Sequence, residues 1–426
     1  MKISVLALAA GLVLAAGGAA PAAAPRSLPA PPTRLLAYDW QAQALMRVDP
    51  LTLRRHGALV RTGNPVWHAF SPDGGRLVLA PDFGRLELVD VRRGRFLGRF
   101  PSLGRSTWVD GLLWADPGRV VALVRGASPR AVAVDVAVRR VVSDVPIAGA
   151  VAATAQGRTA LAVLTGPRAG IGPSRLHVVD ARGRVRTAGL ARVRSGAEAL
   201  RGTASGARQL SPGVALDPAG RRAVVIQPAG PATEVDLTTM RVAYHELRTA
   251  RSLAARLHDW LEPQAHAKPV VGPELWAHWI GEDAVAVASW EHAGIGRRGG
   301  EHRAIVRAHG VFLVDVREWT RRTLSETASG LEAAGDTALV YAGAFAAGRP
   351  FGADEGRPPR GLDAHDPGGR RRFRLFGRRV VGGVQAVGAY AYVRVGERSF
   401  DVVDVRAGRV LARARTPHDL TLLDTG

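Results

Sequence analysis

Histidine and tryptophan side chains gather in one stretch of this 426-residue chain, and their chemistry gives the first indication of function. A histidine beside a carboxylate can transfer protons or bind a divalent metal ion. The spacing here matches no compact metal motif, so a divalent metal is the secondary interpretation and no other cofactor is expected. A nearby arginine pair can hold an anionic group. We predict a ligand or partner site between residues 248 and 310, formed by His258, Trp260, His278, Glu291, His292, Arg297, Arg298 and His302.

Signatures of the commoner catalytic classes are absent from the sequence. The chain has no cysteine, which excludes disulfides, thiolate zinc sites and cysteine nucleophiles. It has no Gly-x-Ser-x-Gly elbow, no Gly-rich phosphate loop ending in Lys-Ser/Thr and no His-Glu-x-x-His pair. The remaining enzyme interpretation is a metal-dependent or His/carboxylate hydrolase or lyase of the lactonase kind.

The charge balance bears on the partner. The net charge is +21 and comes almost wholly from arginine. A strongly basic chain favours anionic partners. Nucleic-acid-binding proteins concentrate basic residues in a patch with interleaved aromatics, whereas the arginines here are scattered through every segment. We therefore expect a protein or a small anionic ligand as the partner, and no specific nucleic-acid binding.

The first residues have the features of an export signal. Lys2 precedes an apolar stretch from Ile3 to Leu14, and a tract of small residues ends at Ala24. We expect a signal peptide over residues 1–24, a proline-rich spacer over 25–33, and export to the periplasm or the cell exterior. A retained membrane anchor is the alternative. No later stretch is long and apolar enough to span a membrane.

A repeat runs through the rest of the chain. Its best copy begins with the turn Ser71-Pro72-Asp73-Gly74, in which proline fixes φ and glycine accepts a positive φ. The apolar run 77–80 follows, as expected for a strand buried on both faces. A second run over 86–89 leads to Asp90, which begins another turn, and the arginine-rich stretch 95–99 suits an exposed outer edge.

An aspartate at the end of the second run marks each copy of the repeat. The marker aspartates are Asp49, Asp90, Asp135, Asp180, Asp236, Asp315, Asp366 and Asp404. Eight units of about four short strands predict an all-β fold, a β-propeller with eight blades. Seven blades is the alternative if the unit around Asp366 is only an elaborated loop. The stretch 419–423 should complete the first blade, which lacks one strand, and so close the ring.

The best copy also carries a family resemblance. Ser-Pro-Asp-Gly-x-Arg-Leu over 71–77, followed by Val-Asp-x-x-x-Gly-Arg over 89–95, resembles the repeats of bacterial YVTN/TolB-type and WD40-like β-propellers. The match is strong around Asp90 and Asp404, and the units together cover most of residues 34–424. The motif specifies blade turns, so the resemblance implies a fold and no particular activity. Quinoprotein dehydrogenases have a similar repeat that continues into a docking tryptophan. Gly98 and Ala412 stand at that position here, which argues against membership of that family.

One unit departs from the repeat. The spacing between Asp236 and Asp315 reaches 79 residues, which places an insertion at about 248–310 within a propeller domain of residues 34–426. Connections between propeller strands emerge on the two faces of the ring. We therefore expect the insertion to leave the blade ladder and fold over one face, where its site residues would approach the central channel.

Two classes of function follow from these features. We expect a monomeric binding or scaffold protein with its ligand or partner surface on one face of the ring. The hydrolase or lyase is the alternative, with its centre at the channel mouth. Histidines and carboxylates converging near the axis would favour the enzyme, and an exposed aromatic patch would favour binding.

Overall fold

The computed structural model describes residues 35–57, 60–63, 65–81, 84–104, 107–126, 128–199, 207–249, 274–298, 301–343, 360–396, 398–416 and 420–423. The predicted signal peptide and spacer lie outside these residues. Every named element in the described ranges is a strand, and none of these ranges contains a helix that could cross a membrane.

The strands form eight separate sheets. We number these sheets as blades and give their strands from the centre outward. Blade 1 contains β34 (Leu420–Leu423), β1 (Leu35–Asp39), β2 (Ala44–Val48) and β3 (Val60–Arg61). Blade 2 contains β4 (Pro65–Phe70), β5 (Arg76–Pro81), β6 (Glu87–Asp90) and β7 (Arg95–Arg99). Blade 3 contains β8 (Trp108–Asp116), β9 (Arg119–Arg125), β10 (Arg130–Asp135) and β11 (Arg140–Pro146).

Blades 4 and 6 each have a fifth strand. Blade 4 contains β12 (Ala150–Gln156), β13 (Ala160–Gly166), β14 (Gly170–Asp180), β15 (Val185–Ala199) and β16 (Ala207–Leu210). Blade 5 contains β17 (Gly213–Leu216), β18 (Arg222–Ile226), β19 (Ala232–Asp236) and β20 (Val242–His245). Blade 6 contains β22 (Glu274–Ile280), β23 (Ala284–Arg298), β24 (Glu301–Asp315), β25 (Thr320–Ser325) and β21 (Arg248–Thr249). Blade 7 contains β26 (Gly330–Ala334), β27 (Thr337–Tyr341), β28 (Leu362–His365) and β29 (Arg371–Leu375). Blade 8 contains β30 (Gly383–Val387), β31 (Tyr390–Gly396), β32 (Ser399–Asp404) and β33 (Arg409–Arg415).

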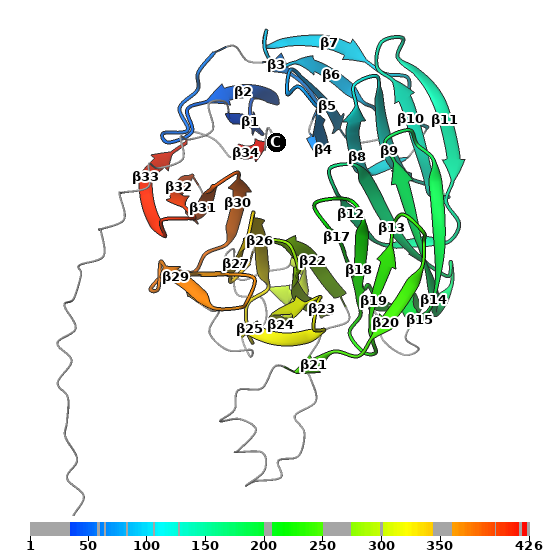
Figure 1. The fold of residues 1–426 in the computed structure, drawn as a ribbon. Coiled ribbons are helices and arrows are strands. Elements are labelled where there is room, and N and C mark those ends of the chain that lie inside the picture. The colour runs from blue at the N-terminus through cyan, green and yellow to red at the C-terminus, as the bar shows by residue number, and fades with distance from the viewer. Residues whose placement is uncertain are drawn as a thin grey trace, which may run out of the picture. The chain divides into compact units, whose positions relative to one another are not determined.

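The blades follow one another around a central channel, with the first strand of each blade nearest the centre (Figure 1). The protein is therefore an eight-bladed β-propeller, as the sequence predicts. The seven-blade alternative is wrong, because the unit around Asp366 forms a complete four-stranded sheet, β26 to β29.

The ring is closed by the C-terminal strand. β34 pairs antiparallel with β1, with Leu423 opposite Leu36. Blade 8 also contacts this strand, since the Leu422 N–H donates to Gln385 Oε1 at 3.0 Å. The predicted completion of the first blade is thus confirmed, and β1 gains a partner along its inner edge.

The core lies between adjacent blades. The second and third strands carry apolar side chains on both faces, and each face packs on the neighbouring sheet. Between blades 2 and 3, for example, Val78 packs with Val120 and Val132, all at most 1% exposed. Val and Ala dominate these strands because β-branched and small side chains fill the narrow space between two sheets.

The marker aspartates are structural. Each of the eight ends a third strand or directly follows it, and its Oδ1 accepts one or more backbone N–H groups of the next turn at 2.7–3.1 Å. An aspartate in this position provides an acceptor for backbone N–H groups that the turn would otherwise leave without a hydrogen bond. The repeat marker therefore encodes turns and carries no ligand chemistry.

Substituting Asp135 by Ala should lower the free energy of unfolding by about 1 kcal/mol, because two turn N–H groups lose their acceptor. Asp135→Asn keeps an acceptor oxygen and should recover most of the loss. The matched control is Asp144→Ala on the same blade, which removes only a partly exposed ion pair with Arg130. Urea unfolding measures all three. An Asp135→Ala protein as stable as the control would contradict the turn assignment.

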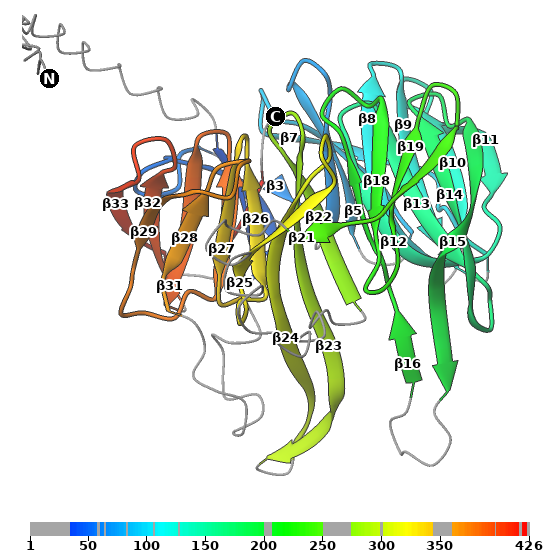
Figure 2. The same cartoon turned by 60° about the horizontal axis from the view of Figure 1, so that its bottom comes forward.

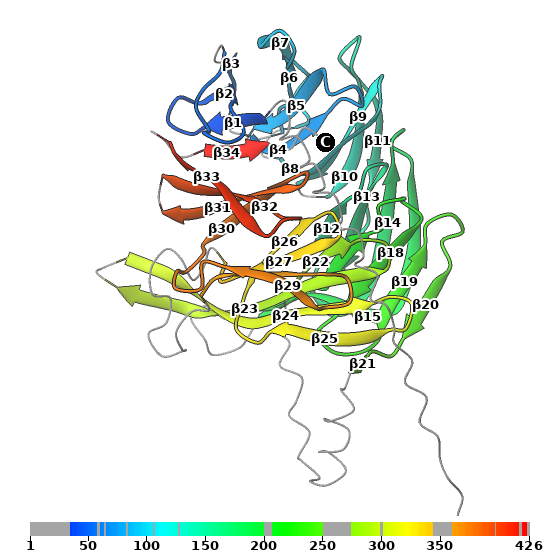
Figure 3. The same ribbon diagram turned by 60° about the vertical axis from the view of Figure 1, so that its left-hand side comes forward.

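The two faces of the ring differ. One face, the turn face, carries the turns between first and second strands and between third and fourth strands. The other, the loop face, carries the second-to-third connections and the links between blades. The long ends of β23 and β24 project past the neighbouring strands on the loop face (Figures 2 and 3), and those of β15 and β16 lie on the same side (Figure 2).

The predicted insertion needs a correction. Residues 274–290 stay in the blade ladder, because β22, β23 and β24 are the first three strands of blade 6. Residues 291–298 of β23 pair with 301–307 of β24 and form the projecting end of the hairpin, so this part does extend beyond the neighbouring strands. The wide marker spacing arises partly because β23 and β24 have 15 residues each. Residues 250–273 lie outside the described residues, so that part of the prediction is untested.

Candidate functional site

The loop face contains the candidate site because the first strand of every blade begins there. Each first strand follows a link between blades and runs towards the turn face. The first residues of these eight strands therefore surround one opening of the channel, which we call the loop-face mouth.

Three tryptophans stand at the loop-face mouth. Trp108 is the first residue of β8, and Trp276 is the third residue of β22. Trp40 lies in the turn between β1 and β2, where its indole Nε1 donates to Thr421 Oγ1 of β34 at 2.9 Å. These mouth tryptophans come from blades 1, 3 and 6, so they are spread around the opening.

The mouth tryptophans are unusually exposed for their type. Their exposed fractions are 45% for Trp40, 47% for Trp108 and 53% for Trp276. Burying an indole removes a large apolar area from water, so leaving three of them half exposed costs free energy unless something covers them. Exposed aromatic side chains gathered at one opening are typical of a binding surface.

Trp276 is the centre of a small aromatic group. Its ring meets the Trp290 ring edge-on, with centroids 6.2 Å apart, and the His278 ring at 5.3 Å. Trp290 lies on β23, opposite Glu274 of β22. The group therefore joins the first two strands of blade 6 where the long hairpin begins to project.

His278 adds a neutral imidazole to this group. Burial lowers its pKa from 6.5 to about 4, so the ring is uncharged at neutral pH. Its Nε2 is buried and has no hydrogen-bond partner among the described residues. Burial also lowers the pKa of His68 on β4 to about 4. β4 and β22 belong to blades 2 and 6, on opposite sides of the channel (Figure 1).

Two carboxylates near the mouth each have a basic side chain beside them. Glu291 Oε2 lies 3.4 Å from His309 Nε2, across β23 and β24. Asp110 on β8 receives a hydrogen bond from Arg125 Nε at 2.5 Å. Burial raises the pKa of Asp110, and Arg125 counters part of that effect. Asp110 also lines a shallow space between the inner strands of blades 2 to 4, of about 180 Å³ when its open side is included.

The predicted site residues have mixed outcomes. The structure places His278 beside Trp276 and Glu291 beside His309. His258 and Trp260 lie outside the described residues. His292, Arg297, Arg298 and His302 are on β23 and β24, where the structure describes their backbone only. In the described ranges no three His, Asp or Glu side chains are arranged to share a metal ion.

The sequence prediction did not include any of the three mouth tryptophans among the site residues, although Trp276 lies within the predicted insertion. Trp40 directly follows a short apolar strand and Trp108 begins one, and both positions are typical of ordinary blade ends. One signal was available in the sequence. A tryptophan at the end of a predicted strand is not needed to fill the core, so its presence there could have indicated a binding role. Which termini meet at the channel depends on the ring, and no local pattern contains that information.

Comparison with known proteins supports the propeller fold. No family model and no curated protein match the sequence. The structure of dihydro-heme d1 dehydrogenase NirN in complex with DHE is similar, with a TM-score of 0.56 and 14% identity over 94% of this chain and 78% of that one. Apo AztD from Citrobacter koseri is similar with a TM-score of 0.51 and 13% identity, over 92% of this chain and 97% of that one. Both share the propeller fold. At such identities the likeness shows nothing finer.

Proposed function

We propose that this chain is an exported binding protein of the YVTN/TolB propeller type, whose ligand docks at the loop-face mouth. The observation that carries the proposal is the exposure of the three mouth tryptophans around one channel opening. A ligand with a flat apolar body would stack on these indoles and recover the free energy that their exposure costs.

The enzyme alternative has less support. It requires unpaired histidines and carboxylates that converge on the axis. Glu291 and His309 do pair at the mouth, but they belong to the second and third strands of blade 6. The first strands, which surround the channel, do carry His68, His278 and Asp110, but these lie in blades 2, 6 and 3, and Asp110 already accepts a hydrogen bond from Arg125. The same strands contribute Trp108 and Trp276, and aromatic side chains provide stacking surface more readily than proton transfer.

The net charge favours an anionic ligand. With 58 Lys and Arg against 37 Asp and Glu, the whole surface attracts anions at long range. NirN, which shares the fold, is a dihydro-heme d1 dehydrogenase solved in complex with DHE. A flat, aromatic and anionic molecule is therefore the class that we propose, and haemin is a practical probe of that class.

Haemin binding should depend on the mouth tryptophans. Replacing Trp108 and Trp276 together by Ala should weaken haemin binding about 30-fold, because each stacked aromatic contact contributes about 1 kcal/mol. The measurement is titration followed by the haemin absorption band, with melting temperatures checked in parallel.

The matched control is Phe96→Ala, which removes an exposed aromatic ring from β7 on the outer rim. It should leave haemin affinity unchanged. If the rim variant and the mouth variant bind haemin equally, binding is nonspecific and the proposed mouth site is wrong.

A further inference from the structure

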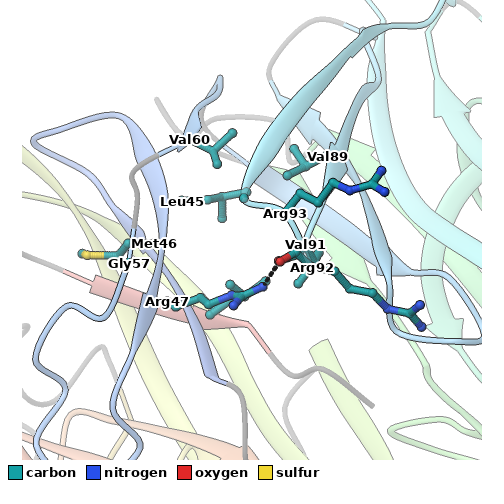
Figure 4. A pocket seen from close by; sticks show the side chains of 11 residues that line it. Leu45, Met46, Arg47, Gly57, Val60, Val89, Val91, Arg92 and Arg93 are labelled. Carbon is teal, nitrogen blue, oxygen red and sulfur yellow. Dashed lines mark hydrogen bonds between the residues drawn. The ribbon is translucent and has the colours of Figure 1, made fainter.

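A second concave site lies on the turn face, away from the loop-face mouth. It is a groove between blades 1 and 2 (Figure 4), with about 470 Å³ of empty space when its open side is included. Its apolar walls come from Leu36 and Leu45 of blade 1, Val60 beside them, and Val89 and Val91 of blade 2. Each of these five side chains is at most 7% exposed. We call it the blade 1–2 groove.

Arginines form the rim of this groove. Arg92 and Arg93 follow Val91 in the turn after β6, and their aliphatic stems continue the apolar wall while their guanidinium groups reach outward (Figure 4). Arg92 pairs with Asp73 at 2.9 Å, and Arg93 lies 3.6 Å from Asp90. The Arg93 side chain is 82% exposed, so it can reorient towards a ligand at little cost.

Arg47 supplies the third positive charge. Its Nη2 donates to the carbonyl oxygens of Val91 and Arg92, the latter at 2.7 Å, which ties blade 1 to the turn of blade 2. Arg186 and Arg322 make the same kind of bond to a turn carbonyl of the following blade. No carboxylate among the described residues pairs with Arg47. The rim thus has three guanidinium groups against two carboxylates.

We propose that the blade 1–2 groove binds a linear aliphatic carboxylate. The hydrocarbon chain would lie against the Leu and Val walls and the arginine stems, where it leaves water. The carboxylate would meet the guanidinium of Arg93, with Arg92 and Arg47 adding to the positive potential. The combination of a narrow apolar slot with a cationic rim excludes cationic ligands and disfavours uncharged ones.

Hexanoate is the probe, and 1-hexanol is its uncharged counterpart. Ligand-observed NMR titration of the full chain should give saturable hexanoate binding, at least five-fold tighter than hexanol. Arg93→Gln keeps most of the stem and removes the charge, so it should weaken hexanoate binding at least three-fold and leave hexanol binding unchanged. Arg95→Gln on β7, outside the groove, is the matched control.

A second variant tests the apolar slot. Val60→Phe should fill the groove and abolish binding of both probes, and its melting temperature and circular dichroism report whether the ring stays folded. Because this groove and the mouth lie on opposite faces, Trp108→Ala should not affect hexanoate. Hexanoate binding that does not saturate, or that is equal in wild type, Arg93→Gln and Val60→Phe, would overturn the proposal.

Discussion

We expect a protein that lacks residues 419–426 to be largely unfolded at room temperature, so that heating it produces no cooperative unfolding transition. The deletion removes β34, whose Leu420, Leu422 and Leu423 are at most 4% exposed. Burial of each leucine contributes about 2 kcal/mol. The three together approach the whole stability of a typical domain. The deletion also leaves the inner edge of β1 unpaired, which favours aggregation.

Two comparisons make this prediction specific. A protein that ends at Leu423 keeps the strand and should melt like the full chain. A synthetic peptide of residues 417–426, added to the truncated protein, should restore the transition because it can pair with β1 in the same register. Calorimetry and circular dichroism measure both. A truncated protein with an unchanged melting temperature would show that closure contributes little.

Acidification from pH 6.5 to 4 should destabilise the ring by several kcal/mol through two histidines. Burial lowers the pKa of His68 and of His278 to about 4 in the folded protein, against 6.5 when exposed. The unfolded chain therefore binds more protons than the folded one throughout this window, and stability falls as the pH falls. One pKa unit corresponds to about 1.4 kcal/mol, so each histidine costs at most about 3 kcal/mol below pH 4.

Urea unfolding at a series of pH values measures this loss. His68→Gln and His278→Gln should each flatten the slope between pH 6.5 and 4, because glutamine does not titrate. His56→Gln, at an exposed turn, controls for the effect of the His-to-Gln substitution itself. Asp49 acts in a lower window: the Thr52 backbone N–H lowers the pKa of its carboxyl, which loses its contribution only below about pH 4. Equal slopes in all variants would contradict the assignment.

The repeat could be predicted from sequence because its chemistry is local. A marker aspartate and the turn that follows it lie within five residues, as with Asp236 and Thr239 or Asp404 and Ala407. Local hydrogen bonding of this kind leaves a fixed pattern in the sequence. Closure was also predictable, since an apolar strand without a repeat of its own needs a partner.

The site was less predictable because its residues come from segments that are far apart in the sequence. The marker spacing counts residues between turns and does not distinguish an insertion from longer strands, so β22 and the inner parts of β23 and β24 were predicted to lie outside the blade. The mouth tryptophans Trp40, Trp108 and Trp276 come from three blades, and only ring closure brings these blades to one opening. The charge state of His278 likewise depends on burial that no local pattern shows.

The pairing of β1 with β34 also determines the order in which the protein can fold. Seven blades consist of strands that are close in sequence, so each can form soon after it is synthesised. Blade 1 is different: Trp40 reaches its partner Thr421 across 381 positions of sequence. β1 must wait with an open edge until almost the whole chain is available to fold. The partly folded chain is then a row of blades with two unprotected ends, and it is in this interval that chaperones have most to protect.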